Sequence, residues 1–244
     1  MIVGARLGDV GQVRLYRSAD LRQWQDAGVL DEAEKEMGYM WECPDFFALN
    51  DRRVLMFSPQ GMAAQGYQNR NLFQSGYLLG DWQPGGTFVR EGEFVEMDSG
   101  HDFYAPQSFL TPDGRRIVIG WLDMWESPLP EQQDGWAGML SLPRELSLSA
   151  DSRLQMRPAK EVESLRGAWF PWPVSTLKNQ QTMLVEKCEA MELSCAGTAP
   201  TVALSNMASA SATVCGSTLM RRCSAWCWNV TIRSMACAAR AACR

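Results

Sequence analysis

The chain has 244 residues, of which 46% are hydrophobic and 21% charged, with a formal net charge of −5. This length and composition are typical of a globular protein with one large domain or two smaller ones. The acidic balance argues against nucleic acid or an anionic membrane as the main partner, and no apolar run approaches the roughly 18 residues of a membrane span.

Residues 1 to about 193 predict short strands separated by turns, such as Asn50-Asp51 and Thr111–Gly114. Almost no segment has a helical period, and short helices are expected only at Asp31–Met37 and Lys160–Leu165. Many short strands at this spacing predict an all-β fold, either a sandwich, a barrel or a propeller. The expected strands are Met1–Ala5, Val13–Arg17, Phe46–Ala48, Arg53–Ser58, Phe73–Leu79, Thr87–Arg90, Ser108–Leu110, Arg116–Trp121 and Ala137–Ser141.

The composition changes near Cys195. Residues 1–195 contain all 28 acidic residues against 18 Lys and Arg, whereas residues 196–244 contain five arginines and no acid. Six of the eight cysteines lie from Cys195 to Cys243. Suitable codons for residues 214–237, read one base out of step, encode a more strand-like sequence. We therefore hypothesise a frameshift near residue 195, which sequencing of the DNA would test.

The segment Met40–Phe46 contains a candidate catalytic carboxylate. Glu42 is flanked by Trp41, Cys43 and Pro44, and these surroundings disfavour a charged carboxylate, so Glu42 can serve as a general acid. From the local sequence alone, however, a strand-end glutamate that faces solvent is the favoured interpretation. Asp45 is interpreted as structural, accepting hydrogen bonds from nearby backbone amides.

The segment Asp98–Gln107 contains the single histidine, His101. A Ser99, His101 and Asp102 triad would need a nucleophile elbow of the Gly-x-Ser-x-Gly type, and the sequence has none. A loop whose Tyr104 and Gln107 hydrogen-bond a polar ligand is the preferred interpretation.

Tryptophans are abundant, ten in all, and a third segment places Trp121 and Trp125 close together, followed by Trp136. The flat face of an indole packs on the C–H surface of a sugar, while neighbouring polar groups bind its hydroxyls. For any one of these tryptophans, a place in the core is the favoured interpretation. Cys223 and Cys227 have a spacing that some metal sites use, but no histidine accompanies them.

Four ordered motifs resemble glycoside hydrolase family 32, in particular its bacterial members that cleave sucrose and sucrose 6-phosphate. They are Trp-Glu-Cys-Pro-Asp from Trp41, Asp-Phe-Tyr-Ala-Pro-Gln from Asp102, Gly-Trp-Leu-Asp-Met-Trp from Gly120 and Leu-Pro-Arg-Glu-Leu-Ser-Leu from Leu142. The similarity extends from residue 1 to about residue 193.

The resemblance implies a five-bladed β-propeller followed by a β-sandwich, and retaining hydrolysis of a β-fructofuranosyl bond. It implies Glu42 as the acid/base, with Tyr104 nearby and with Trp121 or Trp125 lining the sugar pocket. We add Asp102 and Gln107 as expected substrate contacts. The expected ligand is sucrose, sucrose 6-phosphate or a fructo-oligosaccharide. No metal or organic cofactor is implied, and the oligomeric state is left open.

Two motifs of the family do not occur in the sequence: Trp-Met-Asn-Asp-Pro-Asn, which holds its nucleophile, and Arg-Asp-Pro. We therefore expect residues 1–150 to be a partial propeller without the first blade and most of the second. Residues 151–195 would be a linker and the start of the sandwich, and residues 196–244 an out-of-frame tail. Such a chain should be nearly inert, and the absence of a leader-like start predicts the cytoplasm. The alternatives are a fructoside-binding propeller remnant, a fructosyltransferase or a related five-bladed glycosidase.

Overall fold

A computed structural model describes residues 1–34, 36–100 and 102–171, together with four later strands. The described chain is almost entirely β-structure, which confirms the predicted all-β class. It divides into two compact units, unit 1 (Met1–Ala159) and unit 2 (Lys160–Arg244). Within the described residues, no helix has the length and apolar character needed to cross a membrane.

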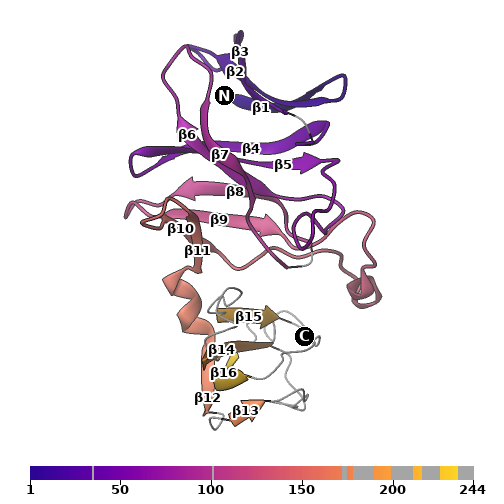
Figure 1. The fold of residues 1–244 in the computed structure, drawn as a ribbon, viewed down its shortest axis with the longest axis vertical. Helices are drawn as coiled ribbons and strands as arrows, with labels where there is room; N and C mark the ends of the chain where they lie inside the picture. The colour runs from indigo at the N-terminus through magenta and orange to yellow at the C-terminus, as the bar shows by residue number, and fades with distance from the viewer. Residues whose placement is uncertain are drawn as a thin grey trace. The chain divides into compact units, whose positions relative to one another are not determined.

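Unit 1 contains three antiparallel sheets that succeed one another in chain order (Figure 1). In each sheet every strand pairs with the next one in sequence, as short connections favour. Repeated four-stranded sheets of this kind are the building units of propellers. Sheet 1 consists of β1 (Ile2–Leu7), β2 (Val10–Arg17) and β3 (Gln25–Glu32); sheet 2 of β4 (Met40–Leu49), β5 (Arg52–Gln60), β6 (Gly76–Asp81) and β7 (Val89–Glu96); and sheet 3 of β8 (Tyr104–Leu110), β9 (Arg116–Trp121), β10 (Arg144–Leu148) and β11 (Leu154–Pro158).

Sheet 2 is buried on both faces, because its central strand β5 contributes side chains to two separate cores. Val54 and Met56 pack with Phe47, Tyr77 and residues of sheet 3. The alternate residues of β5 pack in a second cluster with residues of sheet 1; this cluster comprises Val13, Leu30, Met37, Trp41, Leu55, Phe57, Leu78 and Phe88. Successive side chains of a strand point to opposite faces, so the continuous apolar run of β5 matches its place between two sheets.

Unit 2 begins with a 3-10 turn, η2 (Lys160–Leu165), and continues into a five-stranded sheet. Arg166, the first residue of β12, donates from Nε and Nη2 to the two carboxylate oxygens of Glu192, at 2.7 Å each. This bidentate pair joins the first strand of the sheet to β14. The strands are β12 (Arg166–Pro171), β13 (Ser175–Leu177), β14 (Ala190–Thr198), β15 (Ser211–Cys215) and β16 (Trp226–Met235), and the proposed frameshift in this region stays a prediction.

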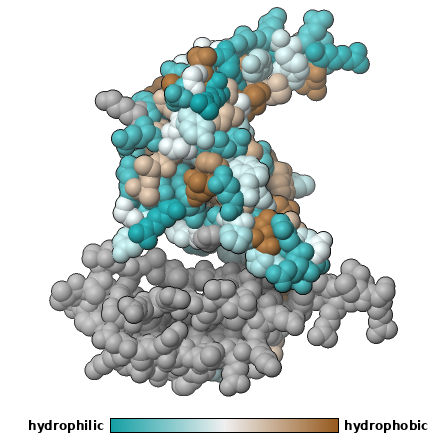
Figure 2. Space-filling view, turned by 90° about the vertical axis from the view of Figure 1, so that its right-hand side faces the viewer, coloured by the Kyte–Doolittle hydropathy of each residue, from teal (hydrophilic) through white to brown (hydrophobic). Residues whose placement is uncertain are grey.

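One face of unit 1 carries its exposed apolar side chains separately rather than in one large patch (Figure 2). On the face drawn in Figure 2, brown hydrophobic residues lie as isolated groups among hydrophilic ones. Leu21 and Leu110, for example, are 77% and 64% exposed and lie in different parts of unit 1. Scattered apolar residues of this kind are ordinary for a folded domain.

Two predicted elements were wrong. The expected helix Asp31–Met37 is instead the end of β3 followed by a turn, since Asp31 pairs with Val13 and its carboxylate accepts two hydrogen bonds from Arg90, both at 2.8 Å. A seven-residue helix has little stability of its own, so strand pairing prevails. The expected strand Ala137–Ser141 forms only an isolated bridge, between Trp121 and Leu140.

The remaining expectations agree with the structure in part. Strands were missed at β3, β10 and β11, where half-exposed polar residues weaken the apolar pattern. Lys160–Leu165 is helical, but as a 3-10 turn. The turn at Asn50-Asp51 is confirmed, and so is the turn at Thr111–Gly114, which the Gly114 N–H to Thr111 O bond of 2.9 Å closes.

Candidate active site

Glu42 lies in β4 at a β-bulge. Its strand partner is Ser58, but the next pair is Asp45 with Met56, so two residues of β4 oppose a single residue of β5. Cys43, the first residue of the bulge, has a φ of +47°, a left-handed conformation that non-glycine residues rarely adopt. The bulge turns the strand directly after Glu42 and so sets the direction of its carboxylate.

Tyr104 lies at an equivalent bulge at the start of β8. It pairs with Trp121, and the next pair is Gln107 with Ile119. Here Ala105 is the left-handed residue, with a φ of +50°. Its N–H donates to Ser58 Oγ at 3.1 Å, so this bulge is tied to the residue that pairs with Glu42. Tyr104 itself is only 1% exposed.

The two bulges bring Glu42 and Tyr104 together with a third polar side chain, Gln60. The Tyr104 hydroxyl donates to Glu42 Oε2 at 2.8 Å, and Gln60 Nε2 donates to the same oxygen at 3.1 Å. Gln60 Nε2 also lies 3.4 Å from the Tyr104 oxygen. Gln60 was not predicted as a site residue, because a glutamine at the end of an apolar strand has no distinctive sequence pattern.

Burial dominates the electrostatics around these groups. It raises the pKa of Tyr104 well above the ordinary tyrosine value, and the bond to Glu42 acts in the same direction while Gln60 opposes it. Tyr104 is therefore a neutral hydrogen-bond donor throughout the physiological range. Desolvation, followed by the nearby Glu42 charge, also raises the pKa of the Cys43 thiol. A protonated thiol is a poor nucleophile, which favours Glu42 over Cys43 as the reactive group.

An aromatic cluster lies beside this triad. Tyr104 and Trp125 meet edge to face at a centroid distance of 5.2 Å, and Trp125 lies 5.5 Å from Trp121. Phe73, which the sequence did not single out as a site residue, contacts Tyr104 at 6.1 Å and Trp125 at 5.9 Å. Trp125 is 57% exposed, so an indole ring supported by the cluster remains open to a ligand.

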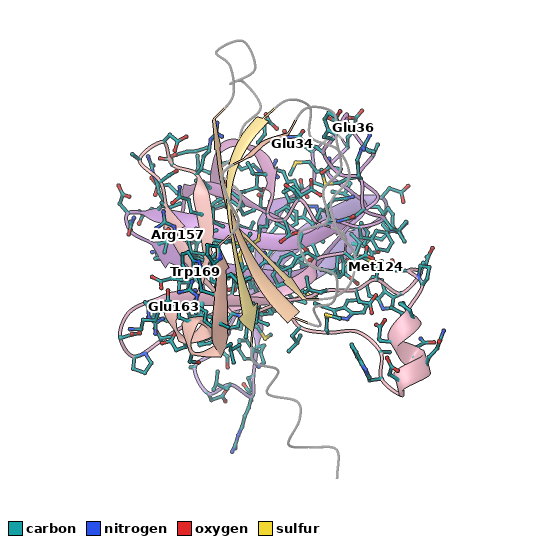
Figure 3. All side chains as sticks on the ribbon, turned by 90° about the horizontal axis from the view of Figure 1, so that it is seen from below. Glu34, Glu36, Met124, Arg157, Glu163 and Trp169 are labelled. Carbon is teal, nitrogen blue, oxygen red and sulfur yellow. The ribbon has the colours of Figure 1, made fainter. Side chains whose placement is uncertain are left out.

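Trp125 comes directly after Met124, which is fully buried and anchors this part of the chain (Figure 3). The chain then continues to the 3-10 turn η1 (Pro130–Asp134), which projects away from the sheets in the same view. Gly138, beyond that turn, returns to the cluster: an added Cβ would lie 2.6 Å from Trp121 Nε1. The backbone there thus requires glycine, both for this approach and for its φ of +72°.

Two further predicted site residues have partners within the protein. Asp102 is 6% exposed and accepts a hydrogen bond of 2.5 Å from Ser127 Oγ. Gln107 is exposed, and its Nε2 donates to Cys43 O at 2.8 Å. Gln107 therefore links β8 to β4 beside the triad, while its role as a substrate contact stays a prediction. His101 lies outside the described residues.

Asp45 also bridges the two strands, although in a different way from the sequence interpretation. Its Oδ2 accepts from Ser108 N at 2.7 Å and from Ser108 Oγ at 2.5 Å, and its Oδ1 lies 3.6 Å from Arg116 Nη2. The amide that it binds is thus on β8 and not on its own strand. Among the described residues, no group of three or more His, Cys, Asp or Glu side chains is arranged to hold a metal ion.

Comparison with known proteins gives a consistent result. The family model described as "Glycosyl hydrolases family 32 N-terminal domain" matches residues 1–158. The chain is 53% identical over 194 residues to sucrose-6-phosphate hydrolase and 52% identical to raffinose invertase, both from Escherichia coli, and the match covers 79% of this chain and 40% of each relative. The chain thus spans about 40% of the length of the curated relatives it matches.

Solved structures with the same architecture include the family 32 β-fructofuranosidase BmSUC1 of Bombyx mori, with a TM-score of 0.72 and 38% identity. That match covers 81% of this chain and 41% of the Bombyx mori chain. A mutant of the same enzyme was solved in complex with sucrose and matches with a TM-score of 0.71.

Proposed function

The chain belongs to glycosyl hydrolase family 32, and from this membership we propose that the protein hydrolyses terminal β-fructofuranosyl bonds with retention. Sucrose and sucrose 6-phosphate are the proposed substrates, supported by the names of the Escherichia coli relatives and by the sucrose complex of the Bombyx mori enzyme mutant. Because the chain spans about 40% of those relatives, the proposal concerns the activity of the whole protein.

The observation that carries the proposal is the carboxylate of Glu42, held by two donors next to a partly exposed aromatic cluster. In a retaining mechanism one carboxylic acid protonates the departing sugar oxygen while a second carboxylate attacks the anomeric carbon. Glu42 is proposed as the first of these, and as the base that activates water in the second step.

Sugar binding is assigned to the exposed edge of the aromatic cluster. Trp125 offers an indole ring for packing on a sugar, and Trp121 contacts that ring edge to face. Asp102 and Gln107 remain proposed contacts to sugar hydroxyls, because both lie on the chain that flanks Tyr104. No cofactor is needed for this chemistry.

The nucleophile is not assigned to any residue of the chain. A retaining enzyme needs a second carboxylate about 5–5.5 Å from the first. The family motif Trp-Met-Asn-Asp-Pro-Asn does not occur in these 244 residues. We therefore expect the 244 residues alone to turn over sucrose on the order of 10⁴-fold more slowly than a protein that carries both carboxylates.

The decisive experiment is the Glu42→Gln substitution in a gene that restores the two absent family motifs, with sucrose and sucrose 6-phosphate as substrates. Loss of the acid/base should lower kcat by roughly 10²–10⁴-fold. Glu93→Gln, which changes an exposed glutamate of β7, is the matched control and should leave kcat unchanged. Undiminished fructose release by the Glu42 variant would refute the assignment.

A fructoside-binding module without turnover is the second candidate, favoured by the exposed Trp125 together with the absent nucleophile motif. Titration of the restored protein with fructose or sucrose, followed by tryptophan fluorescence together with an assay for released fructose, separates the two candidates. A saturable change without product in the restored protein would favour the binding module, and product formation would favour the hydrolase.

A further inference from the structure

The two oxygens of the Glu42 carboxylate have unequal surroundings. Oε2 accepts one hydrogen bond from Tyr104 and one from Gln60. Within the described part of the chain, no hydrogen bond to Oε1 is present. A carboxylate oxygen has two lone-pair sites, so Oε2 has both occupied while Oε1 keeps both open.

From this asymmetry we propose that Oε1 of Glu42 carries the proton that is delivered to the leaving oxygen, and that Gln60 is the positioning residue that enforces this choice. The inference rests on the proposed function, in which Glu42 is the acid/base. In the step itself, the O–H bond of Oε1 breaks as the leaving sugar oxygen gains the proton. The bond between that oxygen and the anomeric carbon breaks, its electron pair stays on the oxygen, and the second carboxylate of the restored protein bonds to the carbon. The electron pair of the O–H bond stays on Oε1, which leaves the carboxylate that later accepts a proton from water.

Gln60 is needed because a tyrosine hydroxyl alone does not decide which oxygen is protonated. A hydroxyl can donate or accept, so Tyr104 could rotate and accept a proton placed on Oε2. The amide nitrogen of Gln60 only donates, and it carries two hydrogens. One is directed to Glu42 Oε2 and the other lies towards the Tyr104 oxygen, which leaves the Tyr104 hydrogen to point at Glu42.

The orientation of the Gln60 amide is set by the same chemistry. While Glu42 is ionised, a turned-over amide would place its carbonyl oxygen against a carboxylate oxygen that has no hydrogen to share. The backbone of Gln60 is also held, since its carbonyl accepts from Tyr39 N at 2.8 Å and it pairs with Met40. Gly38 lies so close that an added Cβ would be 2.5 Å from the Gln60 carbonyl oxygen. The side chain is therefore directed across to β4 from a rigid strand end.

Infrared spectroscopy of the 244-residue chain tests the inference without any need for turnover. The carbonyl stretch of protonated Glu42 is isolated with ¹³C-labelled glutamate, by subtracting the spectrum of the Glu42→Gln variant. A hydrogen bond to the carbonyl oxygen weakens the C=O bond, so Gln60→Leu should move this band to higher frequency. The control Gln83→Leu, at an exposed glutamine, should leave the band in place. An unmoved band in Gln60→Leu would overturn the inference.

A kinetic measurement separates the inference from the proposed function. In the protein with the two family motifs restored, Gln60→Leu should lower kcat for sucrose by about 10-fold or more with little change in KM. A nitrophenyl fructoside, whose leaving group needs no proton, should lose less than about 3-fold. Equal losses on both substrates would show Gln60 to be merely structural and would overturn the positioning role. If the restored protein shows no turnover, the hydrolase proposal fails, while the infrared band still decides which oxygen of Glu42 is held.

Discussion

Strands β4 and β8 each contain the same kind of β-bulge, but they differ in the residue that follows the bulge. In each strand, a site residue precedes a left-handed residue and a proline: Glu42 precedes Cys43 and Pro44, and Tyr104 precedes Ala105 and Pro106. Each bulge places two residues against one on the neighbouring strand. The repetition shows that Glu42 and its hydrogen-bond donor Tyr104 are positioned by one geometry used twice, in neighbouring sheets.

The residues after the prolines differ in burial. Asp45 has a side chain that is 12% exposed and accepts three contacts from Ser108 and Arg116. Gln107 is exposed, and its side chain donates from β8 to one backbone carbonyl of β4, that of Cys43. The buried charge should therefore hold the two strands together far more strongly than the exposed amide does.

The largest effect is expected from Asp45→Ala, because it leaves the largely buried Arg116 guanidinium without its carboxylate partner and the Ser108 N–H without its acceptor. The free energy of unfolding should fall by about 2–4 kcal/mol, measured by urea denaturation. Asp45→Asn retains an acceptor oxygen and should cost about half as much. A loss below roughly 0.5 kcal/mol for the alanine variant would contradict the dominant role of Asp45.

The next effect concerns the other strand and depends on pH. The pKa of Tyr104 is raised in the folded state, so the folded chain keeps a proton that the unfolded chain loses above about pH 10. The contribution of Tyr104 to stability is therefore complete below about pH 10 and declines above it, by about 1.4 kcal/mol per pH unit. Tyr104→Phe should remove this slope, and Tyr67→Phe, at a side chain that is 91% exposed, should retain it. Identical slopes in wild type and Tyr104→Phe would contradict the assignment.

A smaller effect is expected from Gln107→Ala, the counterpart of the Asp45 change. It removes one neutral hydrogen bond between β8 and β4, in which the exposed Gln107 side chain donates to the Cys43 carbonyl. The free energy of unfolding should fall by about 0.5–1 kcal/mol in the same denaturation assay. A loss equal to that of Asp45→Ala would mean that burial does not distinguish the two positions.

The smallest effect should come from glycine at the two left-handed positions. Cys43→Gly and Ala105→Gly relieve backbone strain of about 1 kcal/mol but lose a similar amount through the greater freedom of the unfolded chain. Each should change the free energy of unfolding by roughly 0.5 kcal/mol or less. Ala48→Gly, in an ordinary part of β4, has no strain to relieve and should cost about 1 kcal/mol. Equal decreases in the free energy of unfolding for glycine at residues 43, 48 and 105 would contradict the strain argument.

Local sequence was sufficient for the fold class, and the family resemblance selected Glu42 and Tyr104, which the structure brings together. The apolar run at residues 54–57 and turn signals such as Asn50-Asp51 predict short strands, because these patterns depend on neighbours within a few residues. The motif around Glu42 and the motif around Tyr104 also identified the family that the comparisons show. The helix expected at Asp31–Met37 failed, since a polar strand that pairs with a distant partner has no clear period of its own.

Only the tertiary structure decided how the site is assembled. Glu42 and Tyr104 are 62 residues apart in sequence, and Asp45 finds its partner Ser108 at a distance of 63 residues. Gln60 and Phe73 join the site because the end of β5 and the chain before β6 return to it, which no local pattern announces. Sequence patterns determine which residues form strands, whereas strand register and bulges determine which side chains meet, and these depend on contacts made after the sheets have packed.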